Sequence, residues 1–345
     1  MNILPKFFTP ISSDNKKHGR LAPVLFLVLL VLLPVAFFLS LRFGSTDVSL
    51  WEGLRAMFSG EDTPEGRILL YLRLPRALGA LFAGGALAVS GVLIQAVLQN
   101  PMAAPNVIGV NSGAGLGAVL MLAVFPSGVT FLPLAAFLGA VGACLCIYAV
   151  ASRTRAGRST VILVGIAIGS VLNAGINTVK TLYPDSVYDA DAFMIGGLSG
   201  VTYPRLLPAA VLISLALVLA LLLARNGDIL ALGEDTARSL GLRVGRTRAV
   251  FLILAAVLAG AAVSFAGLLG FVGLLVPHIC RMFTGENHRW LIPVSALGGG
   301  FLVLICDLLC RVLFAPYELP VGILLSFVGG PFFLILVLGR KKRRD

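Results

Sequence analysis

Three arginines could recognise an acidic group if their side chains reach a common point. Arg73 and Arg76 stand three residues apart at the head of an apolar run that ends near Leu98, and Arg311 closes a later run. Guanidinium groups bind carboxylates through paired, charge-assisted hydrogen bonds. Two structural interpretations compete with this one. Arginines at the ends of membrane helices extend to lipid headgroups, and Asp307, four residues before Arg311, has the spacing of a helical ion pair.

A second candidate site is the polar loop at residues 225–248, which reads RNGDILALGEDTARSLGLRVGRTR. Leucines and alanines alternate there with charged residues, and Gly233 and Gly241 enclose one or two helical turns. A short amphipathic helix of this kind either lies on a lipid surface or docks into a soluble partner. Because acidic residues offset the basic ones, the pattern favours docking.

The sequence carries none of the common signatures of catalysis or metal binding. It contains no phosphate-binding loop, and neither the HExxH nor the GxSxG pattern occurs. The five cysteines lie in apolar runs without a CxxC pair, which predicts small buried apolar side chains. His278, beside Pro277, is interpreted as structural. We therefore predict no catalytic residue, no metal site and no cofactor bound by this chain.

The composition identifies lipid as the solvent. Of the 345 residues, 58% are hydrophobic and 12% are charged, whereas a soluble domain is about 25% charged. The mean hydropathy is +0.98. A net charge of +11 would indicate nucleic acid in a soluble protein, but no soluble basic domain is present to bind it. Excess Lys and Arg is typical of cytoplasmic loops, so no nucleic-acid partner is predicted.

Apolar runs long enough to cross a bilayer, about 20 residues each, predict an all-α polytopic membrane protein. They fall at residues 21–41, 77–98, 107–124, 131–151, 160–179, 206–224, 249–280, 291–314 and 320–339. The seventh run is long enough for two short spans, and its glycines and Pro277 permit a break. With two spans there, most Lys and Arg residues lie inside; with one, the basic C-terminus would lie outside. We predict ten transmembrane helices with both termini cytoplasmic.

The domain organisation follows from these spans. Residues 1–20 form a cytoplasmic tail, residues 21–339 form the ten-span domain, and residues 340–345 form a basic cytoplasmic tail. The first span is too long for a signal peptide and no small-residue cleavage site follows it, so we expect it to be retained. The orientation places the three arginines on the outer face, against the general charge bias. No chain of carboxylates lies within the spans, which weighs against a proton-coupled carrier.

Three stretches in this order resemble the FecCD-type permeases of ABC importers for iron–siderophore complexes and vitamin B12. They are RLPRALGALFAGGALAVSGVLIQAVLQNPMAAPNVIGVNSGAGLGA, then ALGEDTARSLGL, then GFVGLLVPHICRMFTGENHRWLIPVSALGGGFLVLICDLLCRV with the later ELPVGI and GGPFFLILV. The likeness runs from about Arg73 to Gly339. It implies a ten-span permease that pairs with a second copy, either identical or related. Two cytoplasmic ATPase subunits would lie below this pair, and an extracytoplasmic substrate-binding protein above it.

The resemblance also implies roles for particular residues. Matching positions for docking of the binding protein are Arg73, Arg76 and Arg311. Matching positions for docking of the ATPase are Gly233, Glu234, Asp235, Ala237, Arg238, Leu240 and Gly241. Near the translocation path we place Gln95, Asn100 and Pro101. The stretch DAFMIGGLSGVTYPR, residues 191–205, resembles a short helix on the outer side of these permeases.

The sequence therefore predicts the membrane subunit of an ATP-driven importer in the bacterial inner membrane. It would move an iron–siderophore complex inward, while ATP is hydrolysed on a separate partner. Vitamin B12 and haem are alternative cargoes, since no residue identifies a cobalamin, a porphyrin or a catecholate. A secondary transporter that works without ATP is an alternative of another class.

Overall fold

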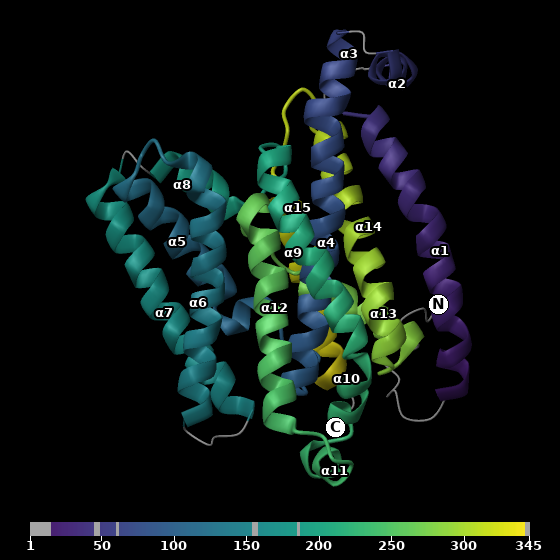
Figure 1. The fold of residues 1–345 in the computed structure, drawn as a ribbon, viewed down its shortest axis with the longest axis vertical. Coiled ribbons are helices and arrows are strands. Elements are labelled where there is room, and N and C mark those ends of the chain that lie inside the picture. The colour runs from purple at the N-terminus through teal and green to yellow at the C-terminus, as the bar shows by residue number, and fades with distance from the viewer. Residues whose placement is uncertain (1–14, 45–48, 60–61, 154–157, 185–186, 342–345) are drawn as a thin grey trace.

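The computed structural model describes residues 15–44, 49–59, 62–153, 158–184 and 187–341. These residues form helices joined by short connections (Figure 1). The α-helices are α1 (Asn15–Arg42), α2 (Leu50–Ser59), α3 (Pro64–Arg67), α4 (Leu74–Leu98), α5 (Val110–Val124), α6 (Leu132–Arg153), α7 (Arg158–Leu182), α8 (Val187–Ile195), α9 (Tyr203–Leu222), α10 (Ala224–Ala231), α11 (Glu234–Ser239), α12 (Val244–Ala266), α13 (Val272–Thr284), α14 (His288–Val312) and α15 (Val321–Lys341). A π-helical turn, η2 (Ile68–Arg73), and two 3-10 turns, η3 (Pro105–Ile108) and η4 (Val129–Phe131), complete them.

The centre of the bundle is α4, which packs against α12, α13 and α14. Together with α3 and η2 it forms one continuous helical run, Pro64–Leu98. Small residues let its backbone approach that of α14 closely. At Gly84 an added Cβ would lie only 2.1 Å from the carbonyl oxygen of Gly299. The two helices are therefore antiparallel neighbours with almost no side chain between them, so each end of the pair carries residues from both.

The long seventh run is broken, as predicted. Helix α12 ends at Ala266, and α13 begins at Val272 and runs back in the opposite direction (Figure 1). Phe271, just before α13, has φ of 63°, a left-handed conformation that costs energy for a residue with a side chain. The run thus supplies two helices rather than one kinked helix.

The prediction of ten spans is supported only in part by helix length. Among the described residues, seven helices are long and apolar enough to cross a membrane, and three more apolar helices are shorter: Val110–Val124, Val272–Thr284 and Val321–Leu336. In Figure 1, α1 begins and α15 ends at the end of the bundle that holds α10 and α11. Following the charge-based orientation, we call this the cytoplasmic end, and the opposite end with α2, α3 and α8 the outer end. The count of ten stays a prediction.

Two predictions are wrong in detail. The short outer helix, expected at residues 191–205, is α8, which ends earlier, at Ile195. Gly196 has φ of 78°, a left-handed conformation that ends a helix. Cys146 is exposed on α6, whereas Cys144 and the three later cysteines are buried as expected. Of the predicted tails, residues 1–14 and 342–345 lie outside the described part of the chain.

Candidate functional site

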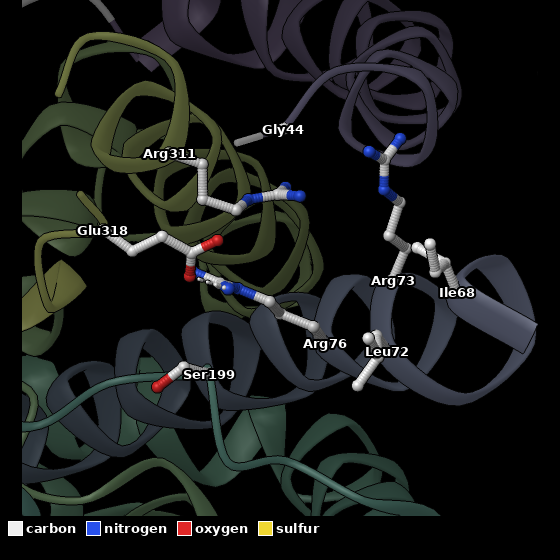
Figure 2. Close-up of a pocket in the computed structure, with 8 residues that line it drawn as sticks. All are labelled: Gly44, Ile68, Leu72, Arg73, Arg76, Ser199, Arg311 and Glu318. Atoms are coloured by element: carbon white, nitrogen blue, oxygen red, sulfur yellow. Dashed lines mark hydrogen bonds and ion pairs between the residues drawn. The ribbon is translucent and has the colours of Figure 1, made fainter. Parts of the chain in front are cut away.

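The three predicted arginines meet at the outer end, where α4 begins and α14 ends. Figure 2 shows Arg73, Arg76 and Arg311 among the residues that line a pocket. The volume of this pocket is about 190 Å³. Glu318, from the connection between α14 and α15, also lines this pocket, as do Gly44 and Ser199. We call the five side chains Arg73, Arg76, Asp307, Arg311 and Glu318 the outer cluster.

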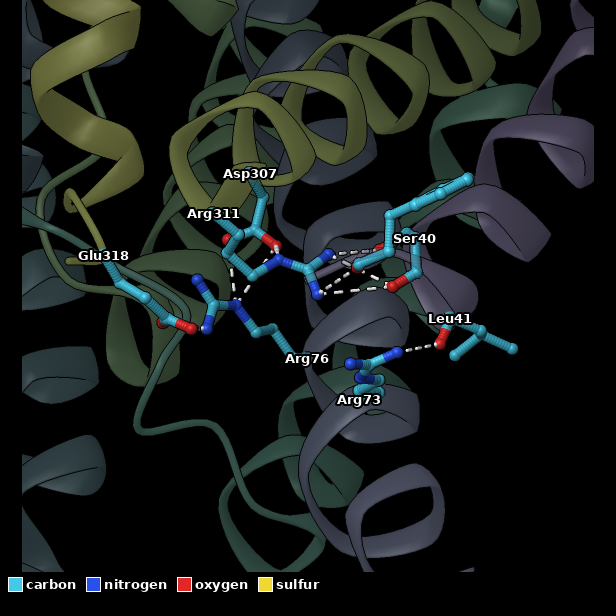
Figure 3. Close-up of polar contacts among 8 residues, drawn as sticks. Ser40, Leu41, Arg73, Arg76, Asp307, Arg311 and Glu318 are labelled. Carbon is cyan, nitrogen blue, oxygen red and sulfur yellow. Dashed lines mark hydrogen bonds and ion pairs between the residues drawn. The ribbon is translucent and has the colours of Figure 1, made fainter. Parts of the chain in front are cut away.

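Arg73 and Arg311 both hold the C-terminal end of α1. Arg73 Nη1 donates to the carbonyl oxygens of Leu41 and Arg42, at 2.7 and 2.6 Å. Arg311 Nη2 donates to Ser40 Oγ at 2.6 Å (Figure 3). Carbonyl groups in the last turn of a helix lack helical partners and carry partial negative charge, so they attract cations. Both arginines are buried, and part of their function is to close this helix end.

Asp307 lies between two guanidinium groups. Its carboxylate accepts from Arg76 Nε at 3.0 and 3.1 Å, and its Oδ2 lies 3.2 Å from Arg311 Nε. The predicted ion pair of Asp307 with Arg311, four residues apart on α14, is thus confirmed. Asp307 is only 1% exposed. A buried carboxylate needs such partners, because an unpaired charge away from water is costly.

Arg76 connects the buried carboxylate to a more accessible one. Its Nη1 donates to Glu318 Oε2 at 2.6 Å, and the Glu318 side chain is 31% exposed. The arginines therefore line a pocket and are bonded within the chain, rather than standing free on an open rim. Sequence spacing could reveal Asp307 but neither Glu318 nor Ser40, which are 242 and 271 residues from their partners Arg76 and Arg311.

The predicted docking loop forms α10 and α11 at the cytoplasmic end. Gly233 and Gly241 enclose α11, with φ of 102° and 82°, so the helical turn expected between them is confirmed. Leu240, just after α11, is 59% exposed. Ala237 faces inward and packs with Leu230 and Val244.

The charged residues of α11 are partly engaged with their neighbours. Glu234 accepts from Arg238 at 2.6 Å and from Arg248 at 2.9 Å, and both Asp235 and Arg238 are exposed. The surface available to a partner thus combines Leu240 with charges of both signs. Ala237 instead fixes the position of α11, and Arg248, on α12, ties it to the membrane helices.

Helix α10 is anchored to α14 and α4 by contacts that the sequence did not reveal. Asp228 accepts from the backbone N–H of His288 at 2.7 Å, and its Oδ1 lies 3.0 Å from the Nδ1 of the same residue. Gln99, at the end of α4, donates to the carbonyl oxygen of Leu230 at 2.5 Å. The docking loop is therefore held at the cytoplasmic ends of the same two helices that carry the outer cluster.

The residues predicted near the translocation path lie at the cytoplasmic end of α4. Gln95 is 2% exposed; it donates to the carbonyl oxygens of Ala103 and Gly273 at 3.0 and 3.3 Å and accepts from Arg281. Asn100 Oδ1 accepts from the N–H of Met102 at 3.0 Å, and Pro101 is half-buried. Gln95 thus joins α4 to α13 inside the protomer. The three residues stay a prediction for the path.

A polar stripe on α7 is open on the surface of the protomer. It consists of Ser170, Asn173, Asn177, Thr178 and Thr181, all of them exposed. The three hydroxyl groups donate to the backbone carbonyl four residues earlier, at 2.8–2.9 Å, which leaves their oxygen atoms outward. Polar faces on membrane helices are costly in lipid and generally face protein or water. Asn173 and Asn177, four residues apart, were the signal in the sequence.

Comparison with known proteins finds one family of transport permeases. The model of the FecCD transport family matches residues 31–339, which extends upstream of the resemblance seen in the sequence. The hemin transport system permease protein HmuU of Yersinia pestis is 36% identical over 338 residues, covering 95% of this chain and 99% of the relative. The Fe(3+)-citrate import system permease protein YfmD of Bacillus subtilis is 34% identical over 325 residues, covering 94% and 97%.

A solved structure has the same architecture. An inward-facing conformation of a putative metal-chelate type ABC transporter superimposes with a TM-score of 0.81 and 27% identity. The match covers 92% of this chain and 99% of that chain. The fold described above is thus that of a transporter permease along almost its whole length.

Proposed function

Since this chain belongs to the FecCD transport family, we propose that it is the membrane-spanning permease subunit of an ATP-driven ABC importer that moves an iron–siderophore complex into the cytoplasm. The observation that carries this proposal is the arrangement of the α4–α14 pair. One end of the pair forms a basic pocket, and the other anchors an exposed docking helix. An importer of this kind needs a partner on each face of the membrane.

The outer partner is an extracytoplasmic substrate-binding protein that presents carboxylates. Three guanidinium groups line the outer pocket, and guanidinium–carboxylate pairs orient partners and raise association rates more than they raise affinity. Ser199 and Gly44 leave room at the pocket for an entering side chain. The predicted roles of Arg73, Arg76 and Arg311 in docking are retained in this form.

The cytoplasmic partner is an ABC ATPase subunit, which hydrolyses ATP while this chain does not. Leu240 and Leu232 are the two large apolar side chains that α11 and its flanks expose to such a partner. An aliphatic anchor that enters a pocket of the partner and is surrounded by a polar rim is a common arrangement at protein interfaces. Gly233, Glu234, Asp235, Arg238 and Gly241 would form the surrounding contact.

A second permease copy, identical or related, completes the path for the cargo. The polar stripe on α7 supports this, because it offers amide and hydroxyl oxygens where a lipid-facing helix would be apolar. Two such stripes facing each other would line a polar passage. We therefore add Asn173 and Asn177 to the residues proposed for the path, alongside Gln95, Asn100 and Pro101.

The cargo is proposed to be a ferric chelate. The two relatives described above are named for hemin and for Fe(3+)-citrate, and the solved structure for a metal chelate. A ferric siderophore is an iron chelate, so it matches both the iron and the chelate in these names. Haem is the first alternative, and vitamin B12 the second.

The test is uptake into proteoliposomes that contain this chain with its ATPase, with binding protein outside and ATP inside. Radiolabelled ferric siderophore, ferric citrate, haem and cobalamin are compared in parallel. We expect ATP-dependent accumulation of a ferric chelate and no accumulation with a non-hydrolysable ATP analogue. Accumulation of haem or cobalamin alone would correct the cargo, and accumulation without ATP would replace the importer with a secondary transporter.

A further inference from the structure

The outer cluster contains two carboxylates that differ in how firmly they are held. Asp307 is 1% exposed and lies within 3.2 Å of nitrogen atoms from both Arg76 and Arg311. It sits on α14, whose backbone packs tightly on α4 at Gly84. Glu318 is 31% exposed and belongs to the connection between α14 and α15, outside any helix. Asp307 is thus built into the cluster, whereas Glu318 can leave it without disturbing a helix.

Glu318 occupies the position that an incoming carboxylate would need. Its Oε2 lies 2.6 Å from Arg76 Nη1, and both residues line the pocket together with Arg73, Arg311 and Ser199 (Figure 2). The other bonded nitrogen of Arg76, Nε, is directed to Asp307. A partner's carboxylate that bonds Nη1 in the same way must therefore take the place of Glu318.

The outer cluster attracts a further carboxylate, and the contact at Arg76 favours exchange with Glu318 over addition beside it. Counting only the five side chains of the outer cluster, three are cationic and two are anionic, which leaves one positive charge in excess. A third carboxylate beside Glu318 would bring two like charges together, which disfavours the ionised form of both. If Glu318 leaves as another carboxylate arrives, the balance and the hydrogen bond to Arg76 are both kept.

We propose that Glu318 is a resident substitute for the partner's carboxylate: it occupies Arg76 in the undocked chain and is displaced when an acidic side chain of the binding protein enters the pocket. The proposal rests on the proposed function, since it takes the acidic partner from there. Docking would then release the connection between α14 and α15. An acidic side chain of the partner would then have to bind Arg76 more tightly than Glu318 does.

The test measures binding of the extracytoplasmic binding protein to the permease–ATPase complex in nanodiscs at low salt. We expect Glu318→Gln to tighten binding by about twofold to fivefold, the factor expected when a competing half-exposed ion pair is removed. The matched control is Glu52→Gln, which removes the same charge from an exposed position on α2 at the outer end. A general effect of charge would tighten binding in both variants, and would overturn the proposal.

A double-mutant cycle links the effect to Arg76. Arg76→Gln removes the guanidinium group for which the two carboxylates compete, while Asp307 keeps Arg311 as a partner. We expect Glu318→Gln to have no effect on affinity in the Arg76→Gln background. Equal or weaker binding by Glu318→Gln alone would overturn the exchange and leave the proposed function standing. If the wild-type complex binds no extracytoplasmic protein, both fail together.

Discussion

The two ends of the α4–α14 pair are built from different chemistry. At the outer end, ionised side chains bond one another in a buried cluster around Asp307. At the cytoplasmic end, helix α10 is held mainly by hydrogen bonds to backbone groups, from Gln99 to Leu230 and from the N–H of His288 to Asp228. The outer end can therefore respond to an incoming charge. The cytoplasmic end instead holds a docking helix in a fixed place.

The tight contact between the two helices should affect both ends of the pair, because both ends depend on it. Gly84→Ala would place a methyl group about 2.1 Å from the carbonyl oxygen of Gly299. We expect a loss of at least about 1–3 kcal/mol from overpacking, seen as a lower melting temperature of the purified chain. The matched control is Gly142→Ala on α6, where an added Cβ meets nothing within 4 Å. An equally stable Gly84→Ala chain would contradict the close packing.

Neutralising one carboxylate at each end sharpens the comparison. Asp307→Asn removes the anion between the buried guanidinium group of Arg311 and the largely buried one of Arg76, and we expect a loss of about 3–5 kcal/mol. Asp228→Asn keeps an oxygen that can accept from the N–H of His288, so we expect a loss of about 0.5–1.5 kcal/mol. Thermal unfolding of both variants, followed side by side, checks the order. Equal losses would mean that the two ends do not differ as described.

A substitution on the docking helix should impair assembly with the ATPase and leave folding of the chain unchanged. Leu240→Asp changes an exposed side chain, so we expect the chain to keep its melting temperature and to release the ATPase subunit. Co-purification of the ATPase with the tagged permease measures this. The same assay on Leu232→Asp, the other exposed leucine beside α11, tests whether the interface extends to that residue. Wild-type stoichiometry with Leu240→Asp would remove this residue from the interface.

Raising the salt concentration should weaken binding at the outer interface more than at the cytoplasmic one, and this is the smallest of the expected effects. The attraction between two separate charged partners weakens as salt rises, because the screening length falls from about 14 Å near 0.05 M to about 4 Å near 0.5 M. We expect binding of the extracytoplasmic protein to weaken several-fold over this range, while retention of the ATPase through Leu240 changes little. Titration of both partners in the same buffers checks this. A stronger salt effect on the ATPase would reverse the assignment of chemistry to the two ends.

The elements of this fold could be predicted from the sequence where the signal is local. Apolar runs placed most of the long helices, glycines marked the break between α12 and α13, and the four-residue spacing predicted the ion pair of Asp307 with Arg311. Pro277, the other residue expected to permit the break, lies inside α13 instead. The contacts that assemble the candidate sites join residues that lie far apart in the sequence. Glu318 reaches Arg76 across 242 residues, and Asp228 reaches His288 across 60. One sequence without its fold contains no signal for such pairs.

The burial of the outer arginines was missed for a related reason. Residue type and position predicted charged groups on the outer face, but burial depends on the C-terminal end of α1, whose carbonyl groups Arg73 and Arg311 cover. Similarly, Gln95 has the polarity expected of a path residue, yet its amide is used within the protomer. The α7 stripe could have been found, since Asn173 and Asn177 lie on one face of a single helix.

The most direct test of the central claim, that the two ends serve partners on opposite faces, is sidedness of transport. Sealed proteoliposomes are prepared with ATP inside and the binding protein either outside or inside, and entry of radiolabelled ferric chelate is followed. The account predicts uptake only with the binding protein outside, and none in liposomes made with Leu240→Asp. Uptake that needs no ATP, or that proceeds with the binding protein inside, would contradict it.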